Sequence, residues 1–140
     1  MSKSARDVMT TDPACCSADT TLDRVAQMMV KNNFGEIPIV DRGNRPIGVV
    51  TDRDIVCRVV AEGKNPTGQT AEAIMTRPVV TVRADTPLDE VISTMEKHQV
   101  RRVPVVDEGG CCTGIIAQAD IAAEAPSQSA AELVREVSRG

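Results

Sequence analysis

Two segments of this sequence combine hydroxyl, carboxylate and cationic side chains at a spacing that suits ligand binding. The first, Gly48-Val-Val-Thr51-Asp-Arg-Asp54, places Thr and Asp residues just after an apolar run. A carboxylate in a first helical turn can accept two hydrogen bonds from a ribose diol, and a Thr hydroxyl with free N–H groups favours a phosphate. The alternative is that Thr51, Asp52 or Asp54 only caps the helix. Capping explains one residue but not the spacing with Arg53, so we favour ligand contact at Asp54.

The second segment, Gly114-Ile-Ile-Ala117-Gln-Ala-Asp120, keeps the aspartate but replaces the threonine by Ala117. This loss weakens phosphate binding at that helix start. Two adjacent arginines, Arg101 and Arg102, precede a strand in the same half of the chain. Neighbouring residues of a strand point to opposite faces, so at most one of them projects into a given cleft. A solvated ion-pair surface is the alternative for this pair.

No other residues assemble a reaction centre. His98 is the only histidine, and a lone histidine beside two arginines is more often a surface residue than a catalytic base. The sequence has no carboxylate pair, nucleophile elbow or glycine-rich phosphate loop. We therefore predict that the protein is not an enzyme and needs no catalytic cofactor.

Four of the five cysteines form two adjacent pairs, Cys15/Cys16 and Cys111/Cys112, and the fifth is Cys57. Adjacent cysteines rarely bridge each other without strain, and zinc sites usually space their ligands as CxxC. We favour cysteines that pack as small buried side chains in a reducing compartment, with no metal. A thiol redox or metal-binding protein remains the alternative.

Composition excludes several partners. The formal net charge is -4 and the pI about 5.0, and Phe34 is the only aromatic residue, so nucleic-acid binding is not expected. No apolar run approaches the ~20 residues that span a bilayer, and residues 1–7 lack the order of a signal peptide. We expect a cytoplasmic protein without a membrane partner, with an aliphatic core.

The chain repeats itself with an offset of 66 residues. Ile37-Pro-Ile-Val-Asp41 matches Val103-Pro-Val-Val-Asp107, and the openings Val8-Met-Thr10 and Ile74-Met-Thr76 also match. We predict a first repeat over residues 4–62, a linker over 63–69, a second repeat over 70–124 and a helical tail over 125–140. Each half is marginal alone, so we expect two sheets that pack face to face as one folding unit.

Apolar periodicity and turn residues predict the same elements in each repeat. The order is helix, strand, helix, strand, strand, helix. Thr20 and Thr86, each followed three residues later by an aspartate, predict N-caps, with Pro87 at the first helical position. The main elements expected are helices Thr20–Asn33, Thr86–Gln99, Asp52–Glu62 and one from Ala119, strands Ile37–Val40, Pro46–Val50, Val103–Val106 and Cys111–Ile116, and extended stretches Ala14–Ser17 and Val79–Val82.

These repeated motifs resemble cystathionine-β-synthase-type (CBS) repeats, and the pair resembles a Bateman module over residues 4 to about 124. The resemblance implies an α/β (α+β) fold of two β-α-β-β-α repeats, packed with pseudo-two-fold symmetry into one module with two clefts. In the family such clefts take AMP, ADP or ATP, sometimes NAD or S-adenosylmethionine. The implied function is a regulatory adenine-nucleotide sensor.

The resemblance also implies which residues touch a ligand. Each aspartate is paired with the opening helix of the other repeat, where aliphatic side chains sandwich adenine, although plain core packing is the alternative for each. Basic residues before the second strand reach phosphates; repeat one has Gly35 and Glu36 there, and Glu36 repels a phosphate. The implied ligand-binding residues are Thr51, Arg53, Asp54, Thr70, Ile74, Met75 and Pro78 for one cleft, and Arg101, Arg102, Asp120, Val8, Met9 and Pro13, with Ser4, for the other.

We therefore predict a sensor that binds an adenosine ligand and signals to an unknown protein partner or through its own dimer. A homodimer is expected because the helices carry more apolar positions than two thin sheets can cover. The alternative is an interaction or structural module whose clefts have degenerated.

Overall fold

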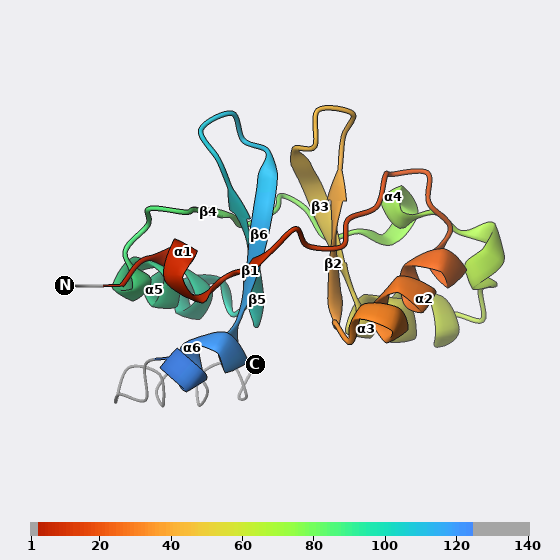
Figure 1. Cartoon of the computed structure of the whole chain (residues 1–140). Coiled ribbons are helices and arrows are strands. Elements are labelled where there is room, and N and C mark those ends of the chain that lie inside the picture. The colour runs from red at the N-terminus through yellow and green to blue at the C-terminus, as the bar shows by residue number, and fades with distance from the viewer. Residues whose placement is uncertain (1–2, 125–140) are drawn as a thin grey trace. The chain divides into compact units, whose positions relative to one another are not determined.

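The computed structural model describes residues 3–124, which fall into two compact units. Residues 3–12 and 80–124 belong to unit 1, and residues 13–79 form unit 2 (Figure 1). Each unit thus combines most of one repeat with the opening segment of the other. The tail helix expected from Ser129 onward lies outside the described residues.

Unit 1 is a four-stranded sheet with strand order β1-β6-β5-β4. The pair β5–β6 is antiparallel, β1 adds to β6 antiparallel and β4 adds to β5 parallel. The elements of this unit are α1 (Ala5–Val8), β1 (Thr10–Thr11), β4 (Val82–Arg83), α5 (Leu88–His98), β5 (Arg102–Val106), β6 (Cys112–Ala117) and α6 (Gln118–Glu124).

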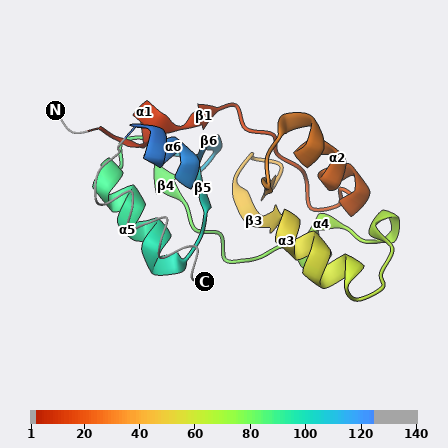
Figure 2. The ribbon, with the colours of Figure 1, turned by 90° about the horizontal axis from the view of Figure 1, so that it is seen from below.

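Unit 2 repeats this arrangement around the antiparallel pair β2–β3. Single-residue bridges take the places of the outer strands: Thr76 pairs with Val49 on one side, and Cys16 pairs with Ile39 on the other. The helices α2 and α3 lie side by side (Figure 2). Its elements are α2 (Leu22–Asn32), β2 (Glu36–Val40), β3 (Pro46–Thr51), α3 (Asp52–Ile55), the π-helix η1 (Val56–Val60), the 3-10 turn η2 (Pro66–Gly68) and α4 (Ala71–Ile74).

Each unit has its own aliphatic core, as a sequence with a single aromatic residue predicts. In unit 2 the apolar face of α2, with Leu22, Val25 and Met29, packs on Ile37 and Ile39 of β2. In unit 1 the corresponding face of α5 packs on β5. The predicted mixed α and β architecture is confirmed, and the four hairpin strands lie within one residue of their predicted bounds.

The predicted N-caps of the two long helices are wrong by one position. The helices begin at Leu22 and Leu88, so Thr21 and Pro87 occupy the N-cap positions, and Pro87 is extended rather than helical. The hydroxyl of Thr86 instead accepts a 2.9 Å hydrogen bond from the N–H of Arg83. The Thr86 hydroxyl is therefore engaged in the turn before the helix. It does not cap the helix, contrary to what the sequence pattern predicts.

The helix expected over Asp52–Glu62 is not uniform. After the short α3 the chain widens into the π-helix η1, in which the N–H of Ala61 donates to the carbonyl of Val56 at 2.8 Å. The helix ends at Val60 with Ala61 as its C-cap, two residues before the predicted end at Glu62, and Gly63 has the left-handed φ of +71 in the turn that follows. Among the described residues no helix is long and apolar enough to cross a membrane.

Candidate functional site

In unit 2 the segment that follows α4 lies directly on strand β3. Thr76 and Val49 exchange backbone hydrogen bonds of 2.8 and 3.1 Å. Gly48 makes this approach possible, because a Cβ atom there would lie 2.6 Å from the Sδ atom of Met75. The opening segment of the second repeat is thereby fixed beside the end of β3, where Thr51 and Asp54 follow.

Thr51 and Asp54 form a reciprocal capping box at the start of α3. The N–H of Thr51 donates to Asp54 Oδ2 at 2.9 Å, and the N–H of Asp54 donates to Thr51 Oγ1 at 3.0 Å. Capping therefore explains the spacing of these two residues, contrary to the sequence argument.

The backbone N–H groups at this helix start are also engaged. The N–H of Asp52 donates to the carbonyl of Gly35 at 2.9 Å, and that of Arg53 donates to Asp52 Oδ1 at 2.8 Å. The expectation of free N–H groups that favour a phosphate at Thr51 is wrong for this unit, because the protein's own oxygens accept all four donors from Thr51 to Asp54.

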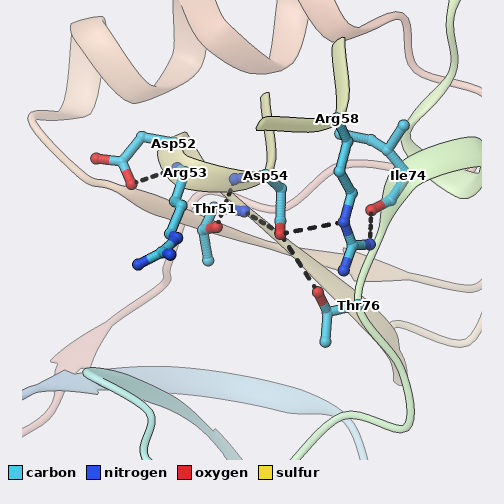
Figure 3. Close-up of polar contacts among 7 residues, drawn as sticks. All are labelled: Thr51, Asp52, Arg53, Asp54, Arg58, Ile74 and Thr76. Carbon is cyan, nitrogen blue, oxygen red and sulfur yellow. Dashed lines mark hydrogen bonds and ion pairs between the residues drawn. The ribbon is translucent and has the colours of Figure 1, made fainter. Parts of the chain in front are cut away.

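Asp54 is the centre of the polar contacts in Figure 3. The Thr76 hydroxyl lies 3.4 and 3.5 Å from its two carboxylate oxygens. Arg58 Nε lies 3.8 Å from Asp54 Oδ1, and Arg58 Nη1 donates a 2.8 Å hydrogen bond to the carbonyl of Ile74. The Asp54 side chain is 13% exposed. A carboxylate has about four lone-pair sites, so Asp54 keeps acceptor capacity for a hydroxyl pair.

The remaining residues predicted for this site are placed differently. Arg53 is exposed and extends away from Asp54 in Figure 3. Met75 is buried against Gly48. Thr70 is the N-cap of α4 and bridges to Thr21, and Pro78 is exposed.

Unit 1 contains the equivalent helix start without the hydroxyl. The N–H of Ala117 donates to Asp120 Oδ2 at 2.9 Å, and the N–H of Gln118 donates to the carbonyl of Arg101 at 2.9 Å. Ala117 offers no side-chain acceptor to the Asp120 N–H. Only one of the two reciprocal capping-box bonds is therefore formed, the one from the Ala117 N–H to Asp120. The Asp120 residue is half-buried.

Arg102 lies directly across the β5–β6 pair from Ala117. Its Nε atom is buried and has no hydrogen-bond partner among residues 3–124, and the same holds for the buried Gln118 Oε1. Arg101, just before the strand, is exposed.

The opening segment of the chain docks in unit 1 as its repeat does in unit 2. Thr10 and Thr11 pair with Ile115 and Gly114, and a Cβ at Gly114 would lie 2.7 Å from Met9 Sδ. Val8 is buried in the core of this unit. Ser4 forms a capping box with Asp7. Pro13 belongs to unit 2 rather than to the unit of Asp120.

Sequence reasoning missed two members of the unit 2 site, Thr76 and Arg58. Thr76 ends the Ile74-Met-Thr76 motif that identifies the repeat, and Arg58 stands four positions after Asp54 on one helical segment. The i, i+4 spacing of opposite charges could have indicated that contact.

A hollow of about 550 Å³ in unit 2 shares no residue with this site. We place the candidate site at Asp54, because it brings together a carboxylate, a hydroxyl and a guanidinium, whereas the hollow is an open groove beside α2. Cys16 lies at the groove with its Sγ 3.1 Å from Met28 Sδ, and burial raises the pKa of its thiol. The groove is lined by Cys15, Cys16, Ser17, Thr20, Arg24, Gln27, Met28 and Lys31.

None of the five cysteines, all of which lie within the described residues, forms a disulfide bond. Within residues 3–124, no three His, Cys, Asp or Glu side chains gather as a metal site would require.

Comparison with known proteins identifies a family. A model of the CBS domain matches residues 5–61 and again 71–127. Hypoxic response protein 1 of Mycobacterium tuberculosis is 36% identical over 133 residues, which cover 95% of this chain and 92% of that protein. An uncharacterized protein of Methanopyrus kandleri is 38% identical over 116 residues, or 83% of this chain but only 57% of that protein.

Two solved structures are similar at a TM-score of 0.81. One is Hypoxic Response Protein I with two coordinated zinc ions, 38% identical, covering 89% of this chain and all of that one. The other is the CBS domain pair of protein MJ0100 in complex with 5′-methylthioadenosine and S-adenosyl-L-methionine, 31% identical, covering 89% of this chain and 96% of that one.

Proposed function

This chain belongs to the CBS domain family as a pair of CBS repeats, and from that premise we propose that it is a regulatory module that binds adenosine ligands. The ligand class comprises AMP, ADP, ATP, NAD and thioether or sulfonium adenosines. Ligand binding changes the shape or the contacts of the module, and this change alters its interaction with a protein partner. The protein performs no reaction itself.

The observation that carries this proposal is the position of Asp54. Its carboxylate is held by the Thr51 N–H and faces Thr76 from the opening segment of the other repeat, 22 positions away in sequence. A fixed carboxylate with remaining acceptor sites suits the two hydroxyls of a ribose. Asp120 holds the equivalent position in unit 1. The similarity to the MJ0100 domain pair, a structure with two adenosine ligands, supports this ligand class.

Aliphatic side chains take the place of aromatic ones at these sites. Ile74 and Met75 directly precede Thr76, whose hydroxyl faces Asp54 in unit 2, and Val8 and Met9 hold the same positions in the segment docked in unit 1. We assign to them contact with the adenine faces, because flexible thioethers and branched side chains pack well against a flat ring.

The module acts as a homodimer in this proposal. Val30 on α2 and Val56 and Val60 on η1 are 83%, 57% and 62% exposed. Exposed apolar side chains favour association with another surface that covers them. In this proposal a second copy of the chain covers the valines of α2 and η1 together.

The test is a titration of adenosine, AMP and ATP against Asp54→Ala and Asp120→Ala proteins. Removing a carboxylate that accepts hydroxyl donors costs about 1.5–3 kcal/mol per charged hydrogen bond, which is roughly tenfold or more in affinity. Each variant should lose one class of binding site, whereas the exposed Asp85→Ala should bind like the wild type. Absence of binding by the wild type at millimolar ligand would overturn the proposal and leave an interaction module with degenerate clefts.

Zinc binding is a second candidate function, favoured by the similarity to Hypoxic Response Protein I with its two coordinated zinc ions. Cys15 and Cys111 are the partly exposed members of the two cysteine pairs. Metal analysis of protein purified without a metal-affinity tag tests this function. Stoichiometric zinc that disappears in a Cys15→Ala, Cys16→Ala protein would support it, and metal-free protein would exclude it.

A further inference from the structure

One position holds an acidic residue in one unit and a basic residue in the other. Glu36 is the cross-strand partner of Thr51 in unit 2, and Arg102 is the cross-strand partner of Ala117 in unit 1. Both positions therefore adjoin the residue from which the ligand-site helix starts. Glu36 is 6% exposed, so its carboxyl group is part of the protein interior there.

Unit 2 offers an incoming phosphate few donors. The four backbone N–H groups of residues 51–54 already donate to the protein's own oxygens. Arg58, the cation of this site, donates to the carbonyl of Ile74 and lies 3.8 Å from Asp54, which offsets its charge. Arg53 extends away from Asp54 (Figure 3). What remains is the Asp54 carboxylate, an acceptor, and Glu36 across the strand pair from Thr51 adds no donor.

Unit 1, in contrast, leaves hydrogen-bond donors that a phosphate can use. Ala117 has no hydroxyl to take up the Asp120 N–H, and within the described part of the chain the buried Nε donor of Arg102 has no partner. Arg101 adjoins the helix start through its carbonyl, which accepts from Gln118. Guanidinium groups with unused donors are the preferred partners of phosphate oxygens.

We infer that the two units select different adenosine ligands by charge. The unit 2 site takes a nucleoside with an uncharged or cationic 5′ group, and the unit 1 site takes a nucleotide with a 5′ phosphate. This inference rests on the proposed function, which requires only that both sites bind adenosine ligands.

The experiment isolates each site with one aspartate variant. Asp120→Ala keeps the unit 2 site, and calorimetry should show that it binds adenosine and 5′-methylthioadenosine at least about tenfold more tightly than ATP, with little dependence on salt. Asp54→Ala keeps the unit 1 site and should show the reverse order, with ATP affinity that falls as salt rises. Equal or inverted preferences in these proteins would overturn the inference, whereas failure of every protein to bind any of the ligands would overturn the proposed function itself.

Exchange of the charges provides the matched test. Arg102→Glu in the Asp54→Ala protein should abolish its preference for ATP over adenosine. Glu36→Arg in the Asp120→Ala protein should raise its ATP affinity, and Glu36→Gln is the milder variant if the buried arginine prevents folding. Thermal melting with and without ligand confirms that each variant is folded. Unchanged ATP to adenosine ratios in the folded Arg102→Glu and Glu36→Gln proteins would contradict selection by charge.

Discussion

Arg58 donates a 2.8 Å hydrogen bond to the backbone carbonyl of Ile74, 16 positions later in the chain. The bond joins η1, which belongs to the first repeat, to the end of α4, which opens the second. The same guanidinium lies 3.8 Å from Asp54. Arg58 thus holds the opening segment of one repeat against Asp54, the carboxylate of the candidate site in the other.

Replacing Arg58 by Met should loosen this attachment. A hydrogen bond to a charged group contributes about 1.5–3 kcal/mol, and the side chain is 51% exposed, so we expect a loss near the lower end, about 1–1.5 kcal/mol. Urea unfolding measures the change. Arg53→Met is the control, because its side chain extends away from Asp54 in Figure 3, and it should leave stability within about 0.5 kcal/mol. Equal losses in the two variants would show that the Ile74 contact contributes nothing.

Gly48 and Gly114 should tolerate no side chain. A methyl group would meet Met75 Sδ at 2.6 Å or Met9 Sδ at 2.7 Å, with a backbone carbonyl close behind. We expect each Gly→Ala change to cost about 1–3 kcal/mol by overpacking. Gly68→Ala is the matched control, since no atom lies within 4 Å of its added Cβ. Stability of Gly48→Ala and Gly114→Ala equal to that of the control would contradict the close docking of the opening segments.

Polar substitution of the exposed valines should dissociate the proposed homodimer. Val30, Val56 and Val60 are all more than half exposed in the single chain. We expect a protein with all three changed to Gln to sediment as a monomer at a concentration where the wild type is a dimer. Arg42→Gln, in an exposed turn, should leave the dimer intact. A wild type that is monomeric at micromolar concentration would exclude this assembly.

Most of the fold could be predicted from the sequence because its signals are local and occur twice. The offset of 66 residues aligns Ile37–Asp41 with Val103–Asp107, and each copy supports the other. The N-caps were misplaced because Thr20 and Thr21 are both acceptable caps, and only the preceding turn decides between them. The π-helix η1 has no distinct residue signature, so it was read as ordinary helix.

The site was harder to predict because its chemistry depends on which donors are already engaged. The spacing of Thr51 and Asp54 fits both a capping box and a ligand clamp, and only the observed bonds show the capping box. Thr76 joins Asp54 through the pairing of a distant segment with β3, a contact that no local pattern encodes. Arg58 lies one helical turn after Asp54, and only this contact has a local signal in the sequence. Their roles toward a ligand stay predictions.

The free energy of unfolding should decline at alkaline pH because the buried Cys16 thiol resists ionisation in the folded state. Burial raises the pKa of its thiol above the unfolded value of about 8.5, so the folded state holds this proton more tightly. The resulting stabilisation is complete below about pH 8.5 and is lost as pH rises through the folded pKa. Urea unfolding from about pH 7 to about pH 10 should show this loss in the wild type and in a protein with the exposed Cys57 changed to Ala. Cys16→Ala, although less stable at pH 7, should show a smaller decline, and an undiminished decline would assign the effect elsewhere.

Thr51→Ala should separate capping from ligand contact at the start of α3. The change removes the acceptor of the 3.0 Å bond from the Asp54 N–H but leaves the Thr51 N–H that holds the carboxylate. Loss of an N-cap hydroxyl costs about 0.5–2 kcal/mol, and Thr51→Ser should restore most of it. Because Asp54 stays in place, adenosine and AMP affinities should each change by less than about threefold. Tenfold weaker AMP binding at unchanged stability would instead place the Thr51 hydroxyl on the phosphate, as the sequence alone predicted.

Ala117→Thr is the reverse change at the equivalent position of unit 1. Ala117→Thr would supply the hydroxyl that the unit 1 helix start lacks, since the Ala117 N–H already donates to Asp120 at 2.9 Å. A completed capping box should stabilise the protein by about 0.5–1 kcal/mol in urea unfolding. The new hydroxyl would also accept the Asp120 N–H, so ATP affinity at this site should fall or stay constant. A gain in ATP affinity would mean that the hydroxyl serves the phosphate rather than the helix, and capping would then not account for Thr51 either.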